Sequence, residues 1–254
     1  MVRRPLIASI LAVITVSPVC AQQRAQTPPP GPRAMAPVDL TGYWVSVVTS
    51  DWRHRMLPPL KGDFESIPLT PEGRRVANLW DPAKDEAAGE QCQAYGAAGL
   101  MRVPGRLRIT WDSDTTLRID TDAGTQTRLL RFGATPPPSA PRDWAGYSIA
   151  RWEAPTASIG IGPRPDLRRL SGSLEVITIN MRAGYLRKNG VPYSENARMT
   201  EYFTRLEEPN GDIWLIVQTI VEDPLYLDHP FITSTPFRKQ ADASGWNPTP
   251  CTSR

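Results

Sequence analysis

The sequence predicts a mainly β protein, an antiparallel meander that closes into a β-barrel with a short helical insertion around residues 70–90. Runs in which apolar and polar residues alternate are typical of strands with one buried face. Short turn motifs separate these runs, as in a series of hairpins. The 254 residues include 27 prolines, which favour loops and strand ends over long helices. A two-sheet sandwich is the alternative arrangement.

The first 21 residues are predicted to be a signal peptide that is cleaved after Ala21. Arg3 and Arg4 precede an apolar stretch from Leu6 to Val16, which is shorter than the about 20 residues that cross a bilayer. A lipoprotein signal that keeps Cys20 is the alternative. We therefore expect a periplasmic or secreted soluble protein without a transmembrane segment.

A polar, proline-rich stretch follows the predicted cleavage point. Residues 22–37 have too few apolar side chains to form a core, so we expect a disordered leader. Neither a sequence repeat nor a second linker interrupts the remainder. Residues 38–254 are therefore predicted to form a single β-barrel domain.

The expected strands begin with residues 40–49, which are rich in aromatic and β-branched side chains. Clear alternation then marks residues 106–111 and 116–121, with a turn between them. Further strands are expected over residues 125–132, 144–153, 174–182, 196–206, 212–222 and 231–239. The motif Asn189-Gly190 predicts a turn inside this series.

One region has the pattern of a helix. Thr70 is a typical N-cap, and Pro71 occupies the first helical position. Leu79 and Trp80 share a face with Val76 at helical spacing. Asp81 and Pro82 end this helix and start a second short one through Ala88.

Three cysteines are present, and cleavage after Ala21 removes Cys20. In an oxidising compartment the remaining pair, Cys92 and Cys251, is expected to form a disulfide. Two unpaired buried thiols are the alternative.

The charge argues against large anionic partners, because Lys and Arg total 29 against 26 Asp and Glu. A net charge of only +3 gives no general attraction to nucleic acid.

Five segments of the chain have a recognisable sequence, namely Asp39–Trp44, Trp144–Glu153, Gly190–Glu195, Thr200–Phe203 and Thr219–Pro224. Together they resemble a family of secreted bacterial proteins of unassigned function. The family often has His where this chain has Tyr193, and the resemblance implies no activity. Gly42 and Trp44 on the first strand are also similar to the opening of lipocalin-like barrels; this suggests that the predicted barrel is lipocalin-like.

Glu201 is the first candidate for catalysis. On its strand it shares a face with Ala197, Met199 and Phe203 by the two-residue period of a strand. A carboxylate among apolar neighbours is costly unless it is paired or protonated, which makes it a candidate acid or base. The alternative is an ion pair with an arginine on the next strand.

A second candidate group lies at a strand end and in the loop that follows it. Glu222 and Asp223 precede Pro224, and Tyr226 and His229 follow. Paired carboxylates near a histidine can transfer a proton or bind a cation. The alternative is a polar loop in which the carboxylates cap backbone groups.

The rim after the first strand combines an aromatic residue, two arginines and His54, in the segment Asp51–Arg55. Such a rim can hold an anionic or sugar-like ligand, although a solvated loop is the alternative. The two histidines are not in a metal-ligand spacing, so we expect no metal site. Gly160 and Gly162 lack the context of a nucleotide-binding loop, so we expect no cofactor.

The aromatic residues suggest a ligand-binding interior. Eight tryptophans are ample for stacking on a flat apolar molecule, although core packing is the alternative. The candidate ligand-binding residues are Trp44, Trp52, Trp111, Trp144, Trp152, Tyr226 and His229.

Three functions remain open from the sequence. The first is an exported barrel that binds a small apolar or aromatic molecule. The second is a lyase, isomerase or hydrolase that uses Glu201, or Glu222 and Asp223, with His54 or Tyr193. The third is a structural or interaction module of the cell envelope with a filled core. Neither the ligand nor the oligomeric state follows from the sequence.

Overall fold

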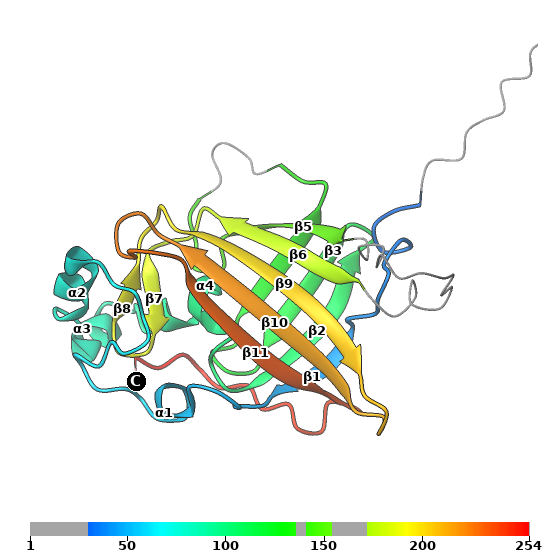
Figure 1. The fold of residues 1–254 in the computed structure, drawn as a ribbon, viewed down its shortest axis with the longest axis horizontal. Helices are drawn as coiled ribbons and strands as arrows, with labels where there is room; N and C mark the ends of the chain where they lie inside the picture. The colour runs from blue at the N-terminus through cyan, green and yellow to red at the C-terminus, as the bar shows by residue number, and fades with distance from the viewer. Residues whose placement is uncertain (1–29, 136–140, 154–171, 254) are drawn as a thin grey trace, which may run out of the picture.

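In the computed structural model, nine strands of the described chain close into one barrel (Figure 1). The structure describes residues 30–135, 141–153 and 172–253. The predicted signal peptide, the first part of the leader and the Gly160 motif lie outside the described residues. The prediction of a mainly β fold with a barrel is confirmed.

Alternating apolar residues give each barrel strand one buried face. Neighbours around the barrel follow the order β1-β11-β10-β9-β6-β5-β4-β3-β2, and β2 pairs with β1 to close it. The strands are β1 (Gly42–Ser46), β2 (Arg106–Ser113), β3 (Thr116–Thr121), β4 (Thr127–Phe132), β5 (Tyr147–Glu153), β6 (Ser173–Ile179), β9 (Arg198–Glu207), β10 (Ile213–Glu222) and β11 (Phe231–Gln240).

One strand pair departs from the predicted antiparallel meander. Strands β4 and β5 run parallel, with Leu130 opposite Ser148 and Phe132 opposite Ala150. A parallel pair needs a long connection, and in the sequence residues 133–146 separate the end of β4 from the start of β5. The prediction was wrong here because strand periodicity carries no information about the direction of a neighbouring strand.

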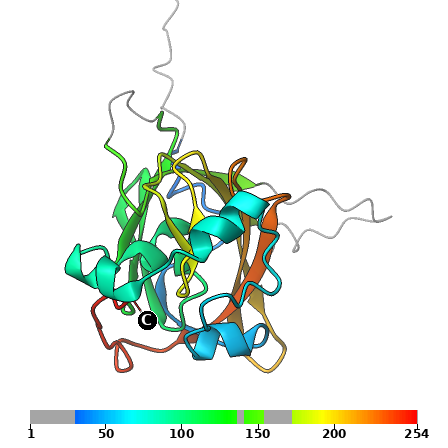
Figure 2. The ribbon, with the colours of Figure 1, turned by 90° about the vertical axis from the view of Figure 1, so that its left-hand side faces the viewer.

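The helices lie mainly between β1 and β2, and gather at one end of the barrel (Figure 2). The helical insertion is confirmed, and the Thr70 hydroxyl accepts a bond from Gly73 N at 3.0 Å. Two four- or five-residue helices were not predicted, because so short a segment shows no periodicity. The helices are α1 (Trp52–Met56), α2 (Pro71–Ala77), α3 (Pro82–Ala87), the 3₁₀ helix η1 (Gln93–Tyr95) and α4 (Ala97–Leu100).

A small hairpin accompanies the helices at this end. Its strands are β7 (Gly184–Arg187) and β8 (Val191–Tyr193), which pair only with each other. The Asn189-Gly190 turn was predicted, but the two strands were not, because each is too short for a clear alternation. Gly190 has φ 78°, and a Cβ there would lie 2.2 Å from Trp80. Glycine therefore allows the hairpin to approach Trp80 in the connection between α2 and α3.

Two of the three apolar clusters in the described chain contain most of its buried side chains. Side chains from all nine barrel strands meet in the first, which includes fully buried Trp44, Phe203 and Phe237. The second joins α2, α4 and the β7–β8 hairpin to the nearby ends of β9, β10 and β11. The barrel interior is therefore packed with side chains, and the helical end has a core of its own.

Part of the predicted leader is held against the barrel. Trp152 Nε1 donates to the Pro32 carbonyl at 2.8 Å, and Arg33 N donates to the Asp114 carbonyl at 3.2 Å. Proline carbonyls accept hydrogen bonds even though proline has no N–H to donate. Residues Pro32 and Arg33 of the predicted leader are thus in defined contact with the barrel.

Candidate functional site at the helical end

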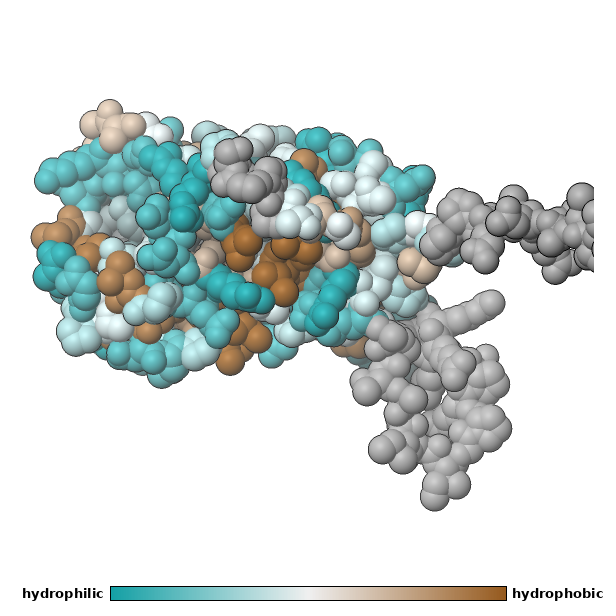
Figure 3. Space-filling model, turned by 90° about the horizontal axis from the view of Figure 1, so that it is seen from above, coloured by the Kyte–Doolittle hydropathy of each residue, from teal (hydrophilic) through white to brown (hydrophobic). Residues whose placement is uncertain are grey.

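A groove opens at the helical end, between the chain before α2 and the chain that joins α2 to α3. Its volume is about 780 Å³. Pro58, Pro59 and Pro82 contribute apolar surface, and the groove is further lined by Leu60, Lys61, Asn78, Leu79, Trp80, Asp81 and Lys84. Figure 3 shows hydrophobic residues among hydrophilic ones at this end of the molecule. The groove thus combines apolar walls with a few polar groups.

Hydrogen bonds fix the walls of the groove. Lys61 Nζ donates to the Trp80 carbonyl at 2.7 Å, which joins one wall to the other. Asn189 Nδ2 donates to the Leu60 carbonyl at 3.0 Å, and Asp81 caps α3 through Ala83 N at 3.1 Å. The groove is therefore held by defined contacts between segments far apart in the sequence.

The apolar walls are unusually exposed. Leu60 and Leu79 have exposed fractions of 80% and 65%, whereas Trp80 is buried. Of the nine large hydrophobic residues that are exposed in the described chain, five lie between residues 52 and 79. Such a concentration marks a surface that meets an apolar partner or ligand.

His54 lies at the same end, on α1, and its side chain is buried. Its Nδ1 is 2.8 Å from Asp51 Oδ1, and its Nε2 is 3.2 Å from Asp63 Oδ1. Burial raises the pKa of both carboxyls, but the bonds from His54 and from arginines outweigh it and leave each pKa below its usual value. His54 is thus a fixed link between α1 and the following loop.

The sequence predicted no metal site, yet three ligand types come together here. Ligand atoms of His54, Asp63 and Glu65 lie within 4.8 Å of one another. Arg53 already pairs with both carboxylates, at 2.6 and 3.5 Å, and Arg187 lies nearby. Because these guanidinium groups oppose a cation, we assign no metal to the cluster.

Glu201 points into the barrel, on the face that the sequence predicted. Arg128 on β4 binds it through two bonds, Nη1 to Oε1 at 3.1 Å and Nη2 to Oε2 at 2.6 Å. Neither side chain is exposed. Ser148 and Thr178 also accept from Arg128 Nη2, at 3.4 and 3.2 Å. Glu201 is therefore one half of a buried ion pair, but its partner comes from β4 rather than from a neighbouring strand.

The Glu222–His229 group does not converge. Asp223 is buried and accepts bonds from Ser194 N, Ser194 Oγ at 2.8 Å and Leu225 N at 2.9 Å. Glu222 and His229 are exposed. Burial raises the pKa of the Tyr226 hydroxyl, as do the nearby carboxylates. Asp223 thus caps a loop, which is the alternative that the sequence left open.

Tyr193 is buried in the second apolar cluster. Its hydroxyl has no hydrogen-bond partner among the described residues, and a Cβ on Gly96 would lie 2.3 Å from it. Burial raises the pKa of this hydroxyl strongly. The structure does not bring Tyr193 into contact with Glu201 or His54 through any hydrogen bond of the described chain.

The candidate tryptophans are distributed over the whole molecule. Trp44 is fully buried in the barrel core, and its Nε1 donates to the Leu40 carbonyl at 2.9 Å. Trp111 and Trp152 pack around Phe132, with ring centroids 5.7 and 5.4 Å from it. Trp52 is exposed on α1, and Arg182 stacks over Trp144 at 4.7 Å. They do not form one site.

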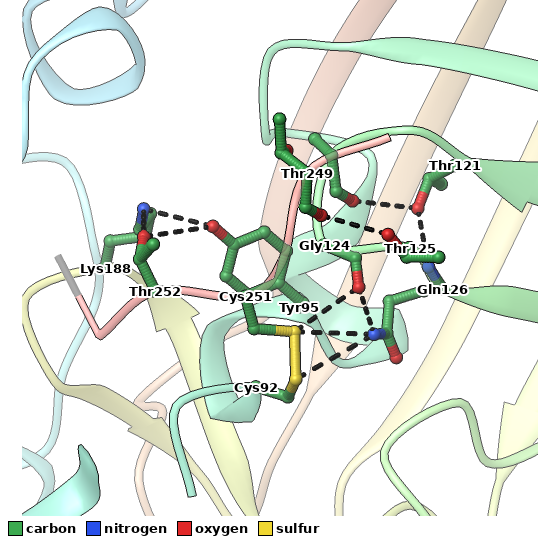
Figure 4. The surroundings of a disulfide bond; sticks show 11 residues. Cys92, Tyr95, Thr121, Gly124, Thr125, Gln126, Lys188, Thr249, Cys251 and Thr252 are labelled. Carbon is green, nitrogen blue, oxygen red and sulfur yellow. Dashed lines mark hydrogen bonds between the residues drawn. A yellow bond between two sulfur atoms is a disulfide. The ribbon is translucent and has the colours of Figure 1, made fainter. Parts of the chain in front are cut away.

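The predicted disulfide between Cys92 and Cys251 is present (Figure 4). It joins the C-terminal tail to the chain before η1, across a sequence separation of 159 residues. Thr249 N also donates to the Asp122 carbonyl at 2.9 Å. The tail is therefore fixed to the β3–β4 turn and closes one side of the helical end.

Sequence reasoning missed the groove and Arg128. Leu79 and Trp80 were recognised only as one face of a helix, and Leu60 stood out in no pattern. Arg128 lies on a strand that alternates like its neighbours, so its inward position was readable, but its pairing with Glu201 depends on which strands adjoin. The segment Asp51–Arg55, which was noted as a rim, does lie at the helical end.

Comparison of the chain with family models, with curated proteins and with solved structures gives no match. The resemblance to a secreted family therefore stays a prediction. In the described part of the chain, no helix has the length and apolar character required to cross a membrane.

Proposed function

We propose that this is an exported β-barrel protein that binds a small apolar or aromatic molecule, and that the groove at the helical end is its binding site. The exposed apolar walls of a groove of about 780 Å³ carry the proposal. Small-molecule sites have volumes of roughly 300–1,000 Å³ and combine apolar walls with a few polar groups. The barrel interior is packed, which favours the groove over the lumen.

Export is proposed from two features. The N-terminal sequence is typical of a cleaved signal peptide. The Cys92–Cys251 disulfide is compatible with an oxidising compartment, since disulfides rarely persist in the cytosol. Sequencing the N-terminus of the protein recovered from the periplasm or medium tests this, with residue 22 expected first.

Binding is tested with an uncharged fluorescent probe, N-phenyl-1-naphthylamine, whose emission increases in apolar surroundings. Leu60→Asp places a charge in the groove and should weaken binding roughly tenfold, because about 1.5–3 kcal/mol accompanies burial of a leucine-sized surface. Leu206→Asp is the matched control, since Leu206 is exposed near the end of β9, outside the residues that line the groove.

The outcomes separate the alternatives. Weaker binding in Leu60→Asp with no change in Leu206→Asp supports the groove. No probe binding by the wild type, or equal loss in both variants, contradicts it. Mass spectrometry of the protein purified under native conditions then identifies an endogenous molecule by its mass.

A further inference from the structure

A second crevice at the helical end is lined by basic side chains. It lies between α1, α4 and β7, and its volume is about 30 Å³. Arg55, Arg102, Arg187 and Lys188 all contribute to its lining, together with His54. Arginines come from three separate segments of the chain, so the tertiary structure brings their charges together.

Few carboxylates form ion pairs with the arginines of this crevice. Asp51 pairs with Arg102 and lies 3.7 Å from Arg187. Arg55 forms no ion pair with a described residue, and its Nε donates instead to the Arg102 carbonyl at 3.0 Å. Two guanidinium groups thus pair with Asp51 and the third has no ion-pair partner among the described residues, while Asp63 and Glu65 also act on the charge of Arg187. A buried charge without a counter-charge is costly, so the arrangement favours an added anion.

Two of the arginines have unused donors. Arg55 and Arg187 are 91% and 95% buried, since their exposed fractions are 9% and 5%. Arg55 Nη2 and Arg187 Nε are buried with no hydrogen-bond partner among the described residues. Burial lowers the pKa of each guanidinium to about 10, and repulsion from Arg102 adds to this, while Asp51 acts in the opposite direction on both and Asp63 and Glu65 do so on Arg187. Each of the two arginines thus has a buried N–H group that no described acceptor meets.

The crevice is rigidly built. Arg187 Nη2 donates to the Glu65 carbonyl at 3.1 Å and to Ser66 Oγ at 3.2 Å, which fixes its guanidinium group. Asp51 has φ 55°, a left-handed conformation that few residues other than glycine adopt. Non-glycine residues in this region are often held there by functional sites. Here it lets the Asp51 carboxylate meet both His54 and Arg102.

We propose that the crevice between Arg55, Arg102 and Arg187 binds the oxyanion end of a small molecule, a carboxylate or a phosphoryl group. Planar guanidinium groups suit such anions because they donate two parallel hydrogen bonds. A space of about 30 Å³ accepts a terminal oxygen, not a whole ligand, so the rest of the molecule extends outward. This site is distinct from the apolar groove and does not depend on it.

Anion binding is measured as the rise in melting temperature with inorganic phosphate and with acetate, at constant ionic strength. A ligand that binds only the folded state raises its stability. Arg55→Met and Arg187→Met should each weaken binding about 10- to 100-fold, as expected for the loss of a charged hydrogen bond. Arg53→Met is the control, because Arg53 is exposed and does not line the crevice.

The two anions distinguish the sources of the oxyanion. A larger shift with phosphate indicates a phosphorylated ligand, and a larger shift with acetate indicates a carboxylic acid. No shift with either anion in the wild type overturns the proposal, as does a shift that survives both crevice substitutions. If Arg55→Met fails to fold, Arg55→Lys is used instead. It keeps the positive charge but removes the planar guanidinium group with its two parallel donors, and it should also reduce the shift in melting temperature.

Discussion

Two buried clusters of arginine and carboxylate differ in how their charges balance. Inside the barrel, Arg128 faces one carboxylate, Glu201, and both of its terminal nitrogens are bound. At the helical end, Arg102 and Arg187 share Asp51, and Arg55 forms no ion pair with a described residue. Each cluster leaves a buried arginine nitrogen unpaired, so the unpaired nitrogen alone does not separate them. The ion-pair partners separate them, because Arg128 has a carboxylate of its own and Arg55 has none. This supports a structural role for the first cluster and the proposed anion site for the second.

Access separates the two clusters as well. The interior pair is fully buried among side chains of β4, β5, β6 and β9. The three arginines at the helical end line a crevice. Arg128 therefore neutralises the charge of Glu201, the residue that the sequence favoured for catalysis. The rim residues at the helical end instead lie beside the crevice.

The largest expected effect breaks the interior pair. Glu201→Leu leaves Arg128 buried without a counter-charge and should lower the free energy of unfolding by about 3–5 kcal/mol. The double variant Arg128→Met with Glu201→Leu should recover most of this, because no buried charge remains. Urea denaturation measures both. Equal stability of the single variant and the wild type would contradict the interpretation.

The next effect concerns the tail that closes the helical end. Replacing Cys92 and Cys251 together by serine should lower the free energy of unfolding by about 2–5 kcal/mol, since the long loop gains freedom in the unfolded chain. Thermal unfolding of this variant is compared with that of the reduced wild type. The two should agree. A reduced wild type as stable as the oxidised one argues against this role.

The third prediction compares the two clusters directly, and its new element is a small change in unfolding free energy at the helical end. Arg55→Met removes a charge that has no carboxylate partner of its own, so we expect a change in unfolding free energy within about 1 kcal/mol without added anion. Arg128→Met should instead cost about 3–5 kcal/mol, because it strands Glu201. Denaturation of the two variants in parallel tests the contrast. Equal losses would remove the distinction between the clusters.

The smallest expected effect is on pH dependence. The pKa of Asp51 and that of Asp63 are lowered in the folded protein, against about 3.9 in the unfolded chain. The contribution of each carboxylate is therefore present above that value and is lost as pH falls through the folded pKa. Asp51→Asn should weaken the loss of stability between neutral and acid pH. Asp114→Asn, at an exposed site, should leave it unchanged.

The sequence predicted strands well where one face is buried. The run from Thr116 to Thr121 matches β3 in full, and the strand that carries Glu201 has the predicted inward face. Periodicity reports burial directly, so it succeeds there. It failed for β7 and β8, and for α1 and α4, because each of these elements spans too few periods for a repeat to show.

The amino-acid sequence by itself determined the β class, the position of the α2 N-cap, the disulfide pair and the inward direction of Glu201. Each of these follows from local spacing, residue type or cysteine number. Tertiary structure alone decided the parallel β4–β5 pair, the partner of Glu201 and the meeting of Arg55, Arg102 and Arg187. These depend on contacts between residues far apart in the chain, which close only when the barrel and its helical end assemble.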